Sequence, residues 1–192
     1  AEFGIPFAVA GEAAPVPPAR EAHAMTYDPS RGVIVMYGGN ANEGTLADVW
    51  EWDGAWRARP YAGEGPGPLS GHAMVYDSAR SVVLVFGGGP GATATDALWT
   101  WNGSAWNRRF AAGAGPSPRR AAAMVDLVDR GEVLLVGGRD ASGTPLADAW
   151  LWNGKAWRSV TVPPALAPRA EHALGYDPAL GQVVLFGGKG AN

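Results

Sequence analysis

The side chains of this 192-residue chain that are best suited to chemistry recur at matching positions. His23, His72 and His172 are its three histidines, and each precedes an Ala-Met or Ala-Leu pair. Imidazoles that converge on one point could bind a metal ion or act as general bases. Because all three occupy one position of a repeated segment, a need shared by every repeat explains them more simply, such as a hydrogen bond to a neighbouring loop. We therefore expect structural histidines and no metal site.

Tryptophan is concentrated in three similar segments. They are "DVWEWDGAW" (48–56), "ALWTWNGSAW" (97–106) and "DAWLWNGKAW" (148–157). Two tryptophans separated by one residue lie on the same face of a strand, where they could stack on a sugar or peptide or pack against another sheet. Because the pair recurs in every segment, packing between repeats is the favoured interpretation.

Several classes of function are excluded or lack support in the composition. The chain has no cysteine, so it has no disulfide, thiolate metal site or cysteine nucleophile. A net charge of -3 does not supply the basic surface that nucleic acid requires. We find no Gly-x-Ser-x-Gly motif, and "GGGPGATA" (87–94) lacks the Lys-Ser/Thr of a phosphate-binding loop. We expect no catalytic residue, no cofactor, no nucleic-acid partner and no transmembrane segment.

A long internal repeat positions all of these side chains. The segment "HAMTYDPSRGVIVMYGG" (23–39) returns as "HAMVYDSARSVVLVFGG" (72–88), "AAMVDLVDRGEVLLVGG" (122–138) and "HALGYDPALGQVVLFGG" (172–188), at spacings of 49, 50 and 50 residues. The tryptophan segments lie between these copies. A period of this length is typical of propellers and other repeat architectures.

Each repeat contains the pattern of four strands. Alternation in "HAMTY", turn residues in "DPSRG" and the apolar run "VIVMY" predict two strands that end at a glycine doublet. Two further strands flank Asp53-Gly54, Asn102-Gly103 or Asn153-Gly154, which favour tight hairpin turns. A four-stranded antiparallel sheet exposes both faces on its own, so several such sheets are expected to pack radially as blades.

These residues resemble the kelch repeat over essentially the whole chain. The resemblance rests on a glycine doublet that closes the second strand, followed by two tryptophans about six residues apart. It implies an all-β propeller of four-stranded antiparallel blades that mostly serves as a binding module, with a minority of enzymes. The repeat-placed residues are Gly38, Gly39, Gly87, Gly88, Gly137, Gly138, Gly187, Gly188, Trp50, Trp56, Trp99, Trp106, Trp150, Trp157, His23, His72 and His172.

We predict a single domain over residues 1–192 with four blades. The repeats span approximately 20–68, 69–117, 118–167 and 168–192, and the last contains only its first two strands. Counting back from His23 by the offsets of the second repeat places Phe3 at the position of Trp52 and Phe7 at that of Trp56. Residues 1–10 are thus expected to complete the last blade. A closed four-blade ring, half of a larger ring and a fragment of a longer chain all remain open.

The loops that enter the first strand and leave the second strand of each repeat share one end of the channel, which we call the mouth. Loops on a rigid scaffold commonly carry function. A mouth rich in cations would attract carboxylates from an acidic peptide or sugar, although pairing with Glu21, Asp140 and Glu171 would give the arginines a structural role instead. The predicted ligand-binding residues are Arg20, Asn40, Arg119, Arg120, Arg139, Arg169 and Lys189.

The third repeat departs from the pattern at three positions. Ala122 replaces the histidine, Asp126 the tyrosine and Val136 the aromatic residue before the glycine doublet. Either relaxed packing or a site would produce these changes.

The chain is expected to be a non-catalytic binding or scaffolding module that recognises an anionic protein segment or glycan at the mouth. Two alternatives remain: a propeller enzyme acting on a small sugar or acid, and an architectural subunit of a larger assembly. A homodimer or larger assembly could complete the ring. Absence of cysteine and of an initiator Met permits an exported protein, periplasmic or extracellular, without requiring one.

Overall fold

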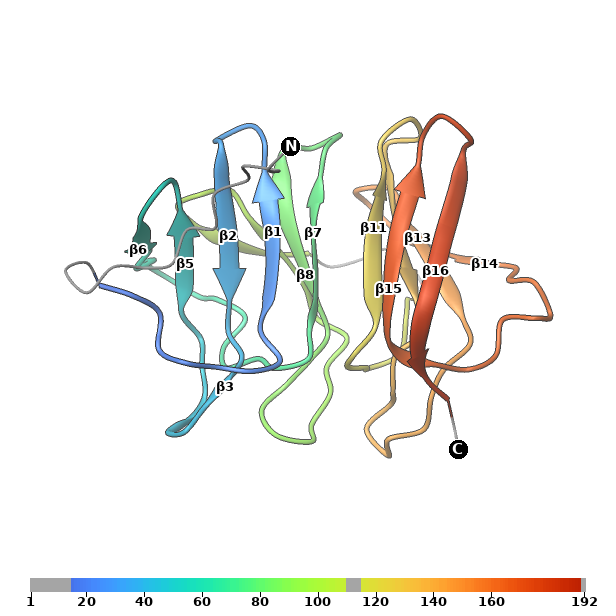
Figure 1. Ribbon diagram of the computed structural model, residues 1–192, viewed down its shortest axis with the longest axis horizontal. Helices are drawn as coiled ribbons and strands as arrows, with labels where there is room; N and C mark the ends of the chain where they lie inside the picture. Colours follow the sequence, from blue (N-terminus) through green and yellow to red (C-terminus); the bar gives the residue numbers. More distant parts are fainter. Residues whose placement is uncertain (1–14, 110–114, 191–192) are drawn as a thin grey trace, which may run out of the picture.

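The computed structural model describes residues 15–109 and 115–190, and this part of the chain consists of β-strands joined by turns and loops (Figure 1). Three four-stranded antiparallel sheets are followed by a two-stranded sheet. The all-β architecture of four-stranded antiparallel blades predicted from the repeats is confirmed. Within the described ranges there is no helix of the length and apolar character needed to cross a membrane.

The sheets follow the repeats, and we call them blades one to four. The strands of blade one are β1 (Ala24–Asp28), β2 (Val33–Tyr37), β5 (Val49–Trp52) and β6 (Trp56–Ala58); those of blade two are β7 (Ala73–Asp77), β8 (Val82–Phe86), β9 (Leu98–Trp101) and β10 (Trp106–Arg109); those of blade three are β11 (Ala123–Leu127), β12 (Glu132–Val136), β13 (Ala149–Trp152) and β14 (Trp157–Val160); and those of blade four are β15 (Ala170–Asp177) and β16 (Gln182–Lys189). A small ribbon of β3 (Asn40–Ala41) and β4 (Gly44–Thr45) projects from the first blade.

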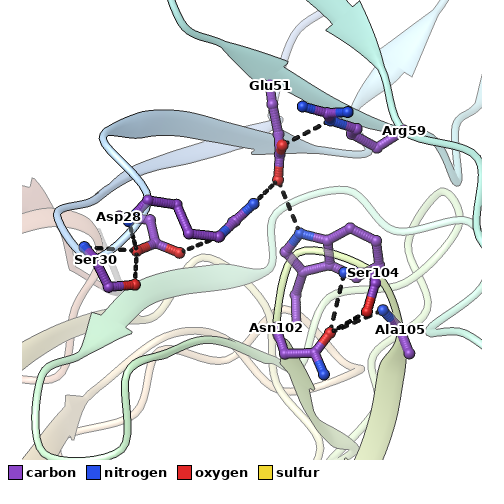
Figure 2. Close-up of polar contacts among 9 residues, drawn as sticks. Asp28, Ser30, Glu51, Arg59, Asn102, Ser104 and Ala105 are labelled. Atoms are coloured by element: carbon purple, nitrogen blue, oxygen red, sulfur yellow. Dashed lines mark hydrogen bonds and ion pairs between the residues drawn. The ribbon is translucent and has the colours of Figure 1, made fainter.

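Local sequence explains these strands and their turns. The second strand of each complete blade is covered on both faces, which is why it reads as a continuous apolar run. The turn after the third strand is closed by its asparagine: the Oδ1 of Asn102 accepts hydrogen bonds from the backbone N–H groups of Ser104 (3.0 Å) and Ala105 (2.9 Å) (Figure 2). Asn153 does the same for Lys155 and Ala156.

The core lies between the blades, and tryptophans fill it. Trp106 of the second blade packs edge-on against Tyr37 of the first, with ring centroids 4.9 Å apart. Trp157 of the third blade packs in the same way against Phe86 of the second, at 5.4 Å. Each indole thus fills the space beside the last residue of the preceding blade's second strand, and such aromatic pairs add specific geometry to a large buried area.

The first glycine of each doublet allows close approach of the next blade. A Cβ on Gly137 would lie 2.5 Å from the carbonyl oxygen of Arg169 in blade four. A Cβ on Gly38 would likewise overlap the carbonyl oxygen of Leu69 in blade two. Both glycines have positive φ, at 60° and 59°, which also disfavours any side chain.

A polar network joins the first two blades on the side away from the mouth. Glu51, which is only 2% exposed, accepts hydrogen bonds from Arg59 (2.7 Å), from the indole of Trp101 in blade two (3.2 Å) and from Arg31 (Figure 2). Arg31 also pairs with the buried carboxylate of Asp28 at 2.8 Å. A buried carboxylate needs such partners, so this network fixes how the two blades meet.

The four blades form an open arc in the described residues. Their innermost strands pack in the order β1, β7, β11 and β15, and β7 and β11 lie between β1 and β15 (Figure 1). This agrees with half of a larger ring and does not show a ring closed within one chain. The predicted completion of the last blade by residues 1–10 lies outside the described residues.

Candidate functional site

The loops at the mouth are linked by backbone hydrogen bonds from blade to blade. The N–H of Gly71 donates to the carbonyl of Ala22 (2.9 Å), that of Ala121 to Gly71 (2.6 Å) and that of Glu171 to Ala121 (2.9 Å). All four residues have φ between 52° and 63°, a left-handed conformation that three of them adopt despite having side chains. This series, which we call the amide ladder, holds the mouth loops at fixed positions.

A cavity of about 270 Å³ opens over the amide ladder. Three predicted ligand-binding residues, Asn40, Arg120 and Arg139, line it together with Glu171. The remaining lining residues are small: Ala22, Ser70, Gly71, Gly91 and Ala121. The structure therefore brings together Asn40, Arg120, Arg139 and Glu171, from the first, third and fourth blades, at one hollow.

Arg120 and Arg139 lie side by side in the mouth loops of the third blade, where their backbones pair as an isolated bridge. The guanidinium of Arg120 makes one long contact, from Nη1 to the carbonyl of Gly91 (3.4 Å), and its Nε is buried without a hydrogen-bond partner in the described part of the chain. Arg139 donates to the carbonyl of Gly143 (3.2 Å). These two guanidinium groups have donors left for an anion.

Glu171 is an acid that lines the mouth cavity. Its carboxylate lies 2.6 Å from Lys189 and 3.9 Å from Arg139. The hydrogen bond from Lys189 is the main cause of a lowered pKa of Glu171, and the charges of Arg139 and Arg120 add to it. Glu171 therefore stays ionised at the mouth, where it competes with an outside carboxylate for the same cations.

Two of the predicted residues, Arg20 and Arg119, have side chains that turn away from the cavity and into their own blades. Arg20 is bidentate with Asp48 (2.6 and 2.8 Å), and Arg119 is bidentate with Asp148 at the same distances. The two arginine side chains are only 3% and 1% exposed. The indole of Trp50 also donates to Asp48, at 2.6 Å.

The arginines change the pKa values of the two aspartates that they contact. Burial raises the pKa of Asp48 and of Asp148, but hydrogen bonds from the arginine and the tryptophan outweigh burial, and both pKa values fall below their usual range. Sequence analysis had suggested Glu21, Asp140 and Glu171 as partners of the arginines. In the structure, Asp48 and Asp148 pair with the repeat-placed arginines, while Glu171 pairs with Arg139 and Lys189.

Arg169 and Lys189 belong to the incomplete fourth blade. Arg169 donates to the carbonyl of Gly187 (3.1 Å), the contact that Arg20 and Arg119 make to Gly38 and Gly137. Its side chain borders an apolar groove between the third and fourth blades and not the mouth cavity. Lys189 reaches the mouth only through its ion pair with Glu171.

His72 and His172 are buried in the structure. Both ring nitrogens of His72 and His172 are buried without a hydrogen-bond partner in the described ranges, so the hydrogen bond suggested from the sequence is absent there. The ring of His72 instead lies edge-on to Tyr37 at 5.6 Å. Burial is the main cause of a lowered pKa of His72, to about 4. In residues 15–109 and 115–190, no group of three His, Cys, Asp or Glu side chains could hold a metal ion.

Sequence reasoning missed Glu51, and it singled out the divergent Asp126 without deciding between relaxed packing and a site. Glu51 stands between Trp50 and Trp52, where the other repeats have Thr100 and Leu151, and an acid flanked by buried indoles was the available indication. One oxygen of Asp126 is buried without a hydrogen-bond partner in the part of the chain described, and burial raises the pKa of Asp126. Asp126 faces the backbone of Ser78 (3.3 Å) and not the mouth.

Comparison with known proteins agrees with the geometry. The family model of the KLHDC2/KLHL20/DRC7 Kelch-repeats domain matches residues 8–188, which is most of the chain. A search of curated proteins gives no match. The match covers all four repeats, the glycine doublets between the blades and the mouth loops. The chain therefore belongs to the kelch-repeat family.

Proposed function

We propose that the mouth of this kelch-repeat domain binds an acidic segment of another protein. Kelch domains generally bind proteins or act as scaffolds, which gives the general class of function. The observation that supports the finer proposal is the pair of guanidinium groups on Arg120 and Arg139 at the mouth cavity, each with one hydrogen bond to a carbonyl among the described residues and further N–H donors. Arg120 and Arg139 are the proposed ligand contacts; Asn40 lines the same cavity, and Lys189 pairs with Glu171.

The remaining predicted residues have a supporting role in this proposal. Arg20 and Arg119 hold the glycine doublet and the third strand of their blades together, so the loops of the mouth stay in place. A carboxylate of the bound segment would form ion pairs with Arg120 and Arg139 and would replace Glu171 as the partner of Arg139. A protein segment is favoured over a glycan because the lining, as far as it is described, contains no aromatic ring on which a sugar could stack.

The test measures binding of a fluorescein-labelled hexaglutamate peptide by polarisation, with hexalysine as the peptide of opposite charge. Arg120→Gln and Arg139→Gln should each weaken hexaglutamate binding by roughly tenfold, the loss of one charge-assisted contact of about 1.5 kcal/mol. Removing the competing acid in Glu171→Gln should strengthen it by roughly two- to fivefold, the value of one exposed ion pair.

Arg57→Gln is the matched control. Arg57 lies on the exposed strand β6, pairs with Asp53 and does not line the cavity. Equal affinity of the wild type and the Arg120 and Arg139 variants would remove the proposal. Equal binding of hexalysine and hexaglutamate would do the same. Tight binding of an oligogalacturonate with no binding of hexaglutamate would assign the mouth to a glycan instead.

A further inference from the structure

The fourth blade ends in an uncovered apolar face. Phe186 on β16 is 81% exposed, whereas Phe86, at the same position of the second blade, is 1% exposed. Val184, two residues earlier on the same face, is 59% exposed, and its equivalent Leu84 is fully buried. In the second blade this face is covered by the blade that follows. Among the described residues, the fourth blade has the residues of such an interface and no blade packed on them.

The first blade has the complementary uncovered face. Tyr27 on β1 is 57% exposed, while its equivalent Tyr76 on β7 is 9% exposed. Tyr76 packs in one buried cluster with Val35 and Tyr37 of the preceding blade. Val35 and Tyr37 are the repeat equivalents of Val184 and Phe186. The face of β1 is therefore shaped for the face that β16 leaves uncovered.

Gly187 gives a second, independent indication. In each earlier doublet a Cβ on the first glycine would meet the next blade: Gly38, Gly87 and Gly137 each face a carbonyl oxygen of that blade. Gly187 has the same positive φ, 74°, yet a Cβ there would meet nothing within 4 Å in the described part of the chain. The backbone is arranged for close approach by another blade.

A groove accompanies this face. The space between the third and fourth blades is a cavity of about 470 Å³ lined by apolar side chains, including Val136, Leu174 and Leu185. Val136 is the equivalent of Tyr37 and Phe86, the residues on which Trp106 and Trp157 pack. In the described residues no aromatic side chain lies in the groove at the position that Trp106 and Trp157 fill in the two earlier pairs of blades.

We propose that a second copy of this chain packs end to end on the first, with its β1 face against β16. Within one chain β7 and β11 separate β1 from β15, so the two faces do not meet (Figure 1). Two copies related head to tail bury both ends of both chains, which is how a repeated asymmetric contact closes into a ring. This inference does not depend on what the mouth binds.

The second copy also carries the residue that fits the groove. Residues 1–10 precede β1 and lie outside the described part of the chain. Phe7 stands 16 residues before His23, as Trp56 stands 16 residues before His72 and Trp106 before Ala122. By this spacing Phe7 has the repeat position of those tryptophans, so Phe7 of the second copy is the occupant that we propose for the groove.

The first experiment measures mass by light scattering on a sizing column. The wild type should have the mass of two chains, and Phe186→Asp should have the mass of one. Gly187→Ala should also yield single chains, because its Cβ meets the second copy only. Gly181→Ala is the matched control: Gly181 has a similar φ of 64° and an equally open surround, at the far end of β16. The Gly181→Ala variant should keep the mass of two chains.

The second experiment tests the orientation by crosslinking, which the absence of cysteine in the natural chain makes clean. His23→Cys and Phe186→Cys alter the pair equivalent to His72 and Tyr37, whose rings lie 5.6 Å apart. Oxidation should link the two variants to each other when mixed, and neither to itself. A self-linked product of either variant would overturn the head-to-tail arrangement.

Phe7→Ala tests the groove. The dissociation constant of the variant should be at least tenfold higher than that of the wild type, since the variant lacks the ring proposed to fill the groove. A single-chain wild type, or a pair that survives both Phe186→Asp and Gly187→Ala, would overturn the proposed interface. Unchanged pairing in Phe7→Ala would overturn the assignment of residues 1–10 to the groove.

Discussion

At the scale of single residues, neighbours in the sequence have opposite roles. Arg119 and Arg120 are adjacent, yet Arg119 is buried against Asp148 while Arg120 borders the mouth cavity. Successive side chains of extended backbone point to opposite sides, so one faces the blade and the other the channel. The sequence predicted that cations gather near the mouth loops. It did not separate the two roles, because the acids that decide them lie 28 or 29 residues away.

The pH dependence of stability tests the role of one buried residue, His72. Its pKa in the folded protein is lowered from 6.5 to about 4 because burial disfavours the charged ring. The unfolded chain therefore binds the extra proton, and the free energy of unfolding should fall as pH drops from 6.5 towards 4, by a few kcal/mol in total. Urea denaturation at a series of pH values measures this.

The matched variant is His72→Ala, since the third repeat naturally carries Ala122 at this position. It should be less stable than the wild type at pH 7, where the packing on Tyr37 is lost, and the gap should narrow on acidification. A wild type whose stability is flat between pH 6.5 and 4 would contradict the role assigned to burial.

At the scale of elements, the repeat predicted most of what was found. Strand order, glycine doublets and Asn-Gly turns follow from local patterns, because period-two alternation and turn residues determine them. The polar network around Glu51 could not be predicted, since it joins the turn after β1 to β5 and to Trp101 of the next blade. Contacts between blades depend on how sheets pack, which the repeat pattern does not encode residue by residue.

The glycine doublet offers a test at this scale. Gly137→Ala places a Cβ against the carbonyl of Arg169, whereas Gly143→Ala has open space around it. Both positions have positive φ, 60° and 87°, so both variants carry about 1–2 kcal/mol of backbone strain. Gly137→Ala should lose clearly more stability than Gly143→Ala in thermal and urea melts. Equal losses would show that blade contact does not require the first glycine.

At the scale of the whole molecule, the ends of the arc differ from its middle. The second blade is covered on both sides, whereas β1 and β16 expose large apolar side chains. The sequence did not decide between a closed ring, a half-ring and a fragment. The residues of each repeat determine only its contacts with the adjacent repeats. The number of blades in a ring depends on the angle between blades, which no single repeat determines.

Association of two arcs predicts a melting temperature that depends on protein concentration. A pair that forms only from folded chains gains stability by mass action, so the wild type should melt at higher temperature when it is more concentrated. The melting temperature of Gly187→Ala should be independent of concentration, and Gly181→Ala should follow the wild type. A wild-type melt unaffected by concentration would indicate that a single chain is the stable unit.

The amide ladder gives the arc a polarity. Every link runs in one sense, from the N–H of a later blade to the carbonyl of the blade before it, from Glu171 through Ala121 and Gly71 to Ala22. An added blade can extend this series only by presenting a carbonyl at one end or an N–H at the other. Face-to-face contact of two identical ends would place donor against donor or acceptor against acceptor. The backbone alone therefore distinguishes productive from unproductive assembly, whatever side chains cover the ends.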